Sequence, residues 1–111
     1  MKDKELIKAT REFTKGLTKG EIDQKCFAIS APLSGYLSFL GVENELIECE
    51  VETPTELWGH YCIELPDGRI LDPTAGQFVG LNLPKIYLGV LPECYLKLRH
   101  SLKLKLCLRK K

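Results

Sequence analysis

Three residues of this 111-residue chain, Cys26, His60 and Asp72, have the types and the order that thiol chemistry requires. A cysteine becomes a nucleophile when a neighbouring base takes its proton and stabilises the thiolate, and an imidazole can serve as that base. The imidazole itself needs a third group that fixes its tautomer and orientation. The chain therefore contains candidates for a nucleophile, a general base and an orienting carboxylate.

The segment that begins at Cys26 has the pattern of a buried helix. Residues 26–42 contain no charged side chain, and Gly41 stands where a left-handed cap would end the helix. Pro32 leaves two alternatives, because an internal proline removes a backbone hydrogen bond. Either the helix is bent at Pro32, or it begins near Ser30 and Cys26 lies in the preceding turn. In both cases Cys26 lies at a helix N-terminus, where free N–H groups lower a thiol pKa.

A hairpin is predicted to bring the other two residues together. Residues 60–65 and 69–72 have strand character, and Pro66-Asp67-Gly68 is a favoured three-residue connection with Gly in the left-handed position. That loop pairs residue 65 with 69, and therefore 62 with 72 and 60 with 74. His60 and Asp72 then become diagonal neighbours on one face, roughly 7–8 Å apart. A slip of one residue would turn Asp72 to the opposite face.

The remaining elements complete an α+β fold, a small antiparallel sheet packed on helices in one compact domain, 1–111. Periodicity predicts an amphipathic helix over residues 3–15, within an N-terminal helical segment 1–20, and a strand over 46–51. Composition makes residues 52–56 a loop. Leucine and lysine alternate over residues 102–108, which predicts a half-buried strand in the basic C-terminal segment 95–111.

The order and flanks of the three residues resemble the transglutaminase-like branch of the papain-like cysteine peptidase superfamily. The resemblance lies in a Cys-initiated helix ending at Gly41, a Gly59-His60 strand opening, and an Asp72-Pro73-Thr74 phrase. It covers about residues 24–78, which would form the catalytic core. It implies a papain-like core and a Cys-His-Asp triad that acts on an amide carbonyl without metal or organic cofactor.

By position, the resemblance makes Cys26 the nucleophile, His60 the general base and acid, and Asp72 the orienting residue. The backbone N–H of Cys26 would donate to an oxyanion, with the Gln24 side chain as a second donor. Trp58 and Gln77 are expected to line the substrate site, although each also fits an ordinary packing role. No metal is expected, because paired C-x(2–4)-C ligand spacings are absent from the sequence.

Charge and cysteine usage restrict the partners. A formal net charge of +1 argues against nucleic acid, and the uncharged stretch is shorter than the ~20 residues that span a membrane. Residues 41–56 carry six glutamates and no Lys or Arg, whereas residues 95–111 carry seven basic residues and no acid. These segments are solvated faces or docking surfaces for a protein partner.

Five cysteines without a CxxC pair or a secretory signal indicate a reduced, cytoplasmic protein.

Two functions of different classes follow. The first is a thiol-dependent hydrolase or acyltransferase that acts on a peptide or glutamine-type amide, as a peptidase, amidase, deamidase or transglutaminase-like enzyme. The second is a papain-like scaffold whose triad is unused and which serves as a protein-binding module. The reactivity of Cys26, and its dependence on His60, distinguishes the two.

Overall fold

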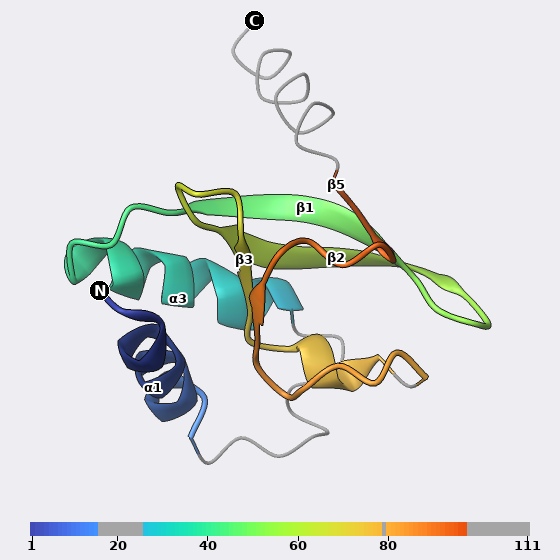
Figure 1. Cartoon of the computed structure of the whole chain (residues 1–111), viewed down its shortest axis with the longest axis horizontal. Helices are drawn as coiled ribbons and strands as arrows, with labels where there is room; N and C mark the ends of the chain where they lie inside the picture. Colours follow the sequence, from blue (N-terminus) through green and yellow to red (C-terminus); the bar gives the residue numbers. More distant parts are fainter. Residues whose placement is uncertain (16–25, 79, 98–111) are drawn as a thin grey trace, which may run out of the picture.

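The computed structural model describes residues 1–15, 26–78 and 80–97 (Figure 1). Within them, two helices and a short 3-10 turn accompany one five-stranded sheet. The elements in chain order are α1 (Asp3–Phe13), α3 (Cys26–Phe39), β1 (Glu45–Glu52), β2 (Leu57–Glu64), β3 (Ile70–Asp72), η1 (Ala75–Gln77), β4 (Tyr87–Gly89) and β5 (Tyr95–Lys97).

The sheet is antiparallel throughout, with strand order β4-β3-β2-β1-β5, and it curls into a half-barrel (Figure 1). The predicted α+β class and the antiparallel sheet are therefore confirmed. The structure adds two short strands, β4 and β5, one at each edge. The predicted strand over residues 102–108 lies outside the described residues, and β5 covers only the start of the basic segment.

The helices pack against one face of the sheet through an aliphatic cluster. It joins α1, α3, β2 and β3, and it consists of Leu6, Leu33, Leu37, Ile63, Leu65 and Leu71. Leu33 and Leu37 of α3 are both fully buried. Burial of each such side chain contributes roughly 1.5–3 kcal/mol relative to exposure, so this helix-face cluster is what fixes α3 against the sheet.

Helix α3 begins at Cys26 and continues through Pro32, so the alternative start near Ser30 is wrong. Pro32 is exposed, and so is Ala28, whose carbonyl loses its helical partner and is free to bind water. The helix ends as predicted, because Gly41 has a φ of 85° and the Val42 N–H donates to the Leu37 carbonyl at 2.9 Å. Cys26 is thus held at the first turn of a helix whose far end is firmly capped.

The β2–β3 hairpin has the predicted register. Ile63 pairs with Leu71, and the Leu65 N–H donates to the Arg69 carbonyl at 2.8 Å. Gly68 has a φ of 89°, the left-handed conformation that the three-residue loop requires. This register puts Asp72 on the same face of the sheet as His60.

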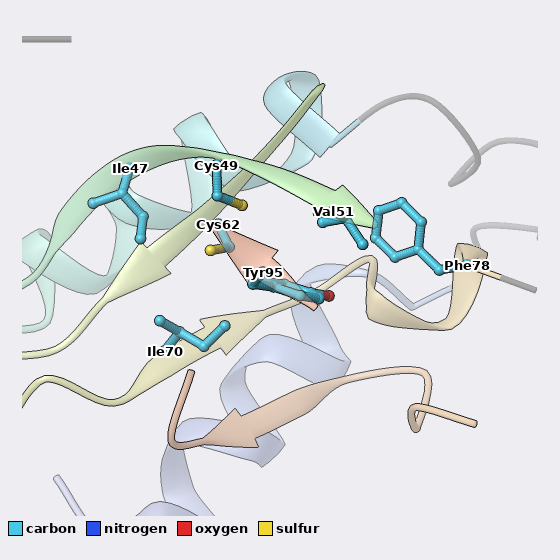
Figure 2. Packing of buried hydrophobic residues seen from close by; sticks show 7 residues of the cluster. All are labelled: Ile47, Cys49, Val51, Cys62, Ile70, Phe78 and Tyr95. Carbon is cyan, nitrogen blue, oxygen red and sulfur yellow. The ribbon is translucent and has the colours of Figure 1, made fainter. Parts of the chain in front are cut away.

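The second face of the sheet carries a different cluster, here called the site-face cluster. Figure 2 shows its buried members, which are Ile47, Cys49, Val51, Cys62, Ile70, Phe78 and Tyr95. The Tyr95 ring lies in the middle of this group, near the thiols of Cys49 and Cys62 (Figure 2). His60 and Asp72 belong to this face, because β1 pairs Cys49 with His60.

Among the described residues, no helix combines the length and apolar character needed to cross a bilayer.

Candidate active site

His60 and Asp72 form a buried pair. The Nε2 atom of His60 lies 2.6 Å from Oδ2 of Asp72, and both side chains have no exposed surface. The predicted approach of the two residues is therefore confirmed. A bond this short between a ring nitrogen and a carboxylate is in the range of charge-assisted hydrogen bonds.

Asp72 is held on both oxygens. Its Oδ1 accepts the Thr74 backbone N–H at 3.0 Å and the Thr74 hydroxyl at 3.3 Å. Its Oδ2 accepts the Tyr95 hydroxyl at 2.6 Å, in addition to His60. The Gln77 side-chain amide donates to the Thr74 hydroxyl at 3.1 Å. Such a set of donors fixes the orientation of the carboxylate.

Two aromatic rings hold the plane of the imidazole. The Phe78 centroid lies 4.8 Å from that of His60 at an interplanar angle of 81°, and the Tyr95 centroid lies 5.6 Å away at 85°. Both are edge-to-face contacts, the geometry that aromatic pairs prefer. Since the ring cannot rotate without losing them, its two nitrogens keep distinct directions.

The first turn of α3 brings Cys26 to the edge of β2. Pairing between β2 and β3 covers residues 63 and 64 only, so the β3 side of Tyr61 faces the helix instead. The Ser30 hydroxyl donates to the Tyr61 carbonyl at 3.4 Å, and the Phe27 ring packs on the Tyr61 ring with centroids 4.9 Å apart. The helix N-terminus thus takes the place that a longer β3 would occupy, next to His60.

The pKa of His60 is raised to about 10. Burial alone would lower the pKa, but the hydrogen bond to Asp72, the interaction with the Cys26 thiol and the charge of Asp72 outweigh it. Because Nε2 is occupied by Asp72, the interaction with Cys26 falls to Nδ1. That nitrogen is buried and has no described partner within hydrogen-bond distance, and catalytic contacts are commonly long in a free enzyme.

The pKa of Cys26 is lowered from the ordinary thiol value. Partial burial opposes this shift, but the imidazole of His60 and the backbone amides of Tyr61 and Phe27 together stabilise the thiolate. The thiol of Cys26 is only partly buried, unlike those of Cys49 and Cys62. The arrangement favours a reactive thiolate beside an imidazolium.

Two other described cysteines, Cys62 and Cys94, have the opposite electrostatics. The pKa of Cys62 is raised by its contact with the Cys49 thiol and by burial, and burial raises the pKa of Cys94. All four described cysteines are free, and the described residues contain no cluster of His, Cys, Asp and Glu suited to a metal ion. Among the three thiols with a shifted pKa, Cys26 alone is shifted toward the nucleophilic form.

The other predicted site residues divide into three cases. Gln24 lies outside the described residues. Gln77 is in η1 and supports Asp72 through Thr74, which is a positioning contact. Trp58 is half-buried and packs on the site-face cluster, two residues before His60 on the same strand face. Whether Trp58 and Gln77 also line a substrate site stays a prediction.

Sequence reasoning missed Tyr95 and the role of Thr74. The Asp72-Pro73-Thr74 phrase carried a signal for Thr74, since aspartate side chains often accept the N–H two residues on. Tyr95 lies 23 residues from Asp72 with no motif around it. Comparison of the chain with protein-family models, with curated proteins and with solved structures finds no match.

Proposed function

We propose that this protein is a thiol-dependent hydrolase or acyltransferase that acts on a peptide or glutamine-type amide through Cys26, His60 and Asp72. The papain-like, transglutaminase-like core belongs to the same proposal. The observation that carries it is the buried His60–Asp72 pair, whose free ring nitrogen is left to a thiol with a lowered pKa. Structural ion pairs also shift pKa values, but they do not need a partly exposed cysteine at a helix start.

The reaction proceeds in two stages. The Cys26 thiolate attacks the carbonyl carbon, a C–S bond forms, and the negative charge moves to the carbonyl oxygen near the first amides of α3. The imidazolium of His60 gives its proton to the leaving nitrogen as the C–N bond breaks, which leaves a thioester. Water or an amine then attacks the thioester, His60 takes the proton of the incoming group, and the Cys26 thiolate is released.

Differences in burial indicate that a substrate contacts the Cys26 thiol and not the His60 ring. His60 exposes only 1% of its surface, whereas Cys26 is partly exposed. The substrate therefore reaches the sulfur from the α3 side, and His60 exchanges protons through Nδ1 without touching bulk water. The aromatic contact between Phe27 and Tyr61 flanks this entrance.

The first test is the alkylation rate of each cysteine by iodoacetamide between pH 5 and 9, with the sites assigned by mass spectrometry. We expect Cys26 to react fastest, with an apparent pKa well below the free-thiol value of about 8.5. Cys94 is the matched control, because it is also partly exposed but its pKa is raised. His60→Gln, checked for folding by circular dichroism, should remove the advantage of Cys26.

Substrate class is tested separately. Glutamine-containing peptides are incubated with the protein, and mass spectrometry follows backbone cleavage, deamidation and incorporation of a labelled primary amine. Cys26→Ala should abolish every product, whereas Cys94→Ala should not. If Cys26 reacts no faster than Cys94, the enzyme proposal fails and the chain is better described as a papain-like scaffold. Its acidic 41–56 and basic 95–111 segments would then be the surfaces to test for a protein partner.

The free cysteines also favour a reducing cellular compartment for this protein. The four described cysteines are free thiols, and a thiolate nucleophile is preserved where glutathione and thioredoxin keep thiols reduced. We therefore include the cytoplasm in the proposal.

A further inference from the structure

Tyr95 shares the carboxylate of Asp72 with His60. The Tyr95 hydroxyl and the His60 Nε2 atom each lie 2.6 Å from the same oxygen, Oδ2. A carboxylate is only an acceptor, so the hydroxyl must donate. Tyr95 is 3% exposed, and this bond satisfies its hydroxyl.

Only the curl of the sheet makes this contact. Strand β5 lies three strand positions from β3 in the order β3-β2-β1-β5. In a flat sheet, three spacings would separate the two strands by about 14 Å, too far for a tyrosine side chain. Because the half-barrel is curled, Tyr95 crosses its inner face and ends at Asp72, among Cys49, Cys62 and Ile70 (Figure 2).

The two carboxylate oxygens of Asp72 have different hydrogen-bond partners. Oδ1 accepts two bonds from Thr74, which lies two residues away and fixes the carboxylate locally. Oδ2 alone faces the imidazole, and there the Tyr95 donor competes with His60 for the same electron density. A donor on this oxygen stabilises the carboxylate by itself and weakens its hold on the imidazole proton.

We infer that Tyr95 is a positioning residue that moderates the basicity of His60 through Asp72, so that the imidazole both holds and releases the proton in the proposed reaction. This inference rests on the proposed function for its role in turnover. Its effect on the imidazole is a separate physical claim. A His60 bound to an unshared carboxylate would hold its proton more firmly and would be a weaker acid toward the leaving group.

The groups that face His60 come from every neighbouring element. They are Cys26 of α3, Cys49 of β1, Cys62 of β2, Asp72 of β3 and Tyr95 of β5. The pKa of Cys62 is raised by its contact with the Cys49 thiol and by burial, and the pKa of Tyr95 is raised by burial and by the negative charge of Asp72, so both stay neutral at physiological pH. Tyr95 therefore acts as a neutral donor.

The test is Tyr95→Phe, which keeps the ring contacts with His60 and Phe78 and removes only the hydroxyl. The ring ¹⁵N shifts of labelled histidine report the protonation of His60 directly, and the chain has only one other histidine, His100. We expect the pKa of His60 to rise by about one pH unit, the scale of one hydrogen bond to a charged group. Tyr87→Phe is the matched control, because its hydroxyl binds the Val90 carbonyl.

Three results are distinguishable. A rise in the pKa of His60 in Tyr95→Phe, with none in Tyr87→Phe, supports the inference even if no amide substrate is found. An unchanged or lower pKa in folded Tyr95→Phe overturns it, whatever the activity. If Cys26 is rapidly alkylated in both proteins but the pKa of His60 is unchanged in Tyr95→Phe, the proposed function stands while the role of Tyr95 falls. If the phenylalanine variant does not fold, Val51→Ala provides the second variant, because Val51 is the direct cross-strand partner of Tyr95. It loosens the ring, and the pKa of His60 should again rise.

Discussion

The two faces of the sheet differ in the kinds of side chain that they bury. The helix-face cluster is aliphatic and comes mainly from leucines of α1, α3 and β2–β3. The site-face cluster contains two thiols, a tyrosine and a phenylalanine, and it encloses the charged pair His60–Asp72. Both faces are buried, but apolar burial is favourable by itself, whereas a buried charge requires a partner and further hydrogen bonds.

The difference indicates a division of labour. The helix face supplies stability and sets the position of α3, and therefore of Cys26. The site face holds a buried polar network, and replacement of such networks by apolar residues of similar volume is often neutral or stabilising. A buried polar network that adds no net stability is expected where its residues take part in a reaction. The following predictions test this division, from the largest expected effect to the smallest.

Replacement of Asp72 by asparagine should have the largest effect. The change leaves a buried imidazole without its counter-charge, so we expect a loss of about 3–5 kcal/mol in the free energy of unfolding. The pKa of His60 should fall from about 10 to about 6.5 or below. Denaturant unfolding and histidine NMR measure the two effects. Asp67→Asn, an exposed control that pairs with Arg69, should change neither, and a similar loss there would contradict the assignment.

Truncation of Leu33 to alanine tests the opposite face. Leu33 is fully buried between α3 and the sheet, so the variant should lose about 2–5 kcal/mol. The pKa of His60 should stay the same wherever the variant is folded, because the cavity opens on the far side of the sheet. Cys62→Ala should cost less, since it removes a single sulfur atom. Equal costs would remove the contrast between the faces.

The pH dependence of stability tests whether Cys26 and His60 form a thiolate–imidazolium pair in the folded protein. Between the ordinary pKa values of histidine and cysteine, about 6.5 and 8.5, the unfolded pair holds one proton, on Cys26. The folded thiolate–imidazolium pair also holds one proton, on His60, so wild-type stability should be nearly constant there. In Cys26→Ala, His60 keeps its proton in the folded protein but loses it in the unfolded protein above about pH 6.5. The free energy of unfolding should therefore fall as the pH rises above about 6.5, by a few kcal/mol at pH 10. Urea unfolding of both proteins measures the slopes, and a falling wild-type slope would argue against the ion pair.

The hairpin turn should be the least sensitive. The Arg69 guanidinium bridges Asp3 and Asp67, which joins the turn to the start of α1, but both carboxylates are more than half exposed. Exposed ion pairs contribute about 0–1 kcal/mol. Arg69→Gln should therefore change the thermal midpoint only slightly and leave the alkylation rate of Cys26 unchanged. A large drop in that rate would mean that the position of α1 matters for the site.

Much of the arrangement was readable from local patterns. The absence of charge over residues 26–42 and the glycine at 41 predicted α3 and its end. The Pro66-Asp67-Gly68 turn fixed the hairpin register, and with it the meeting of His60 and Asp72. These features depend on turn geometry and on side-chain periodicity, which act over a few residues and are therefore present in the sequence itself.

Other features were decided by the tertiary structure. The start of α3 at Cys26 depends on the free edge of β2 at Tyr61, and the tolerance of Pro32 depends on which side of the helix meets water. The contact of Tyr95 with Asp72 depends on the curl of a sheet whose edge strand has only three residues. Such contacts arise when distant segments share one hydrophobic face, so no local pattern of residues encodes them.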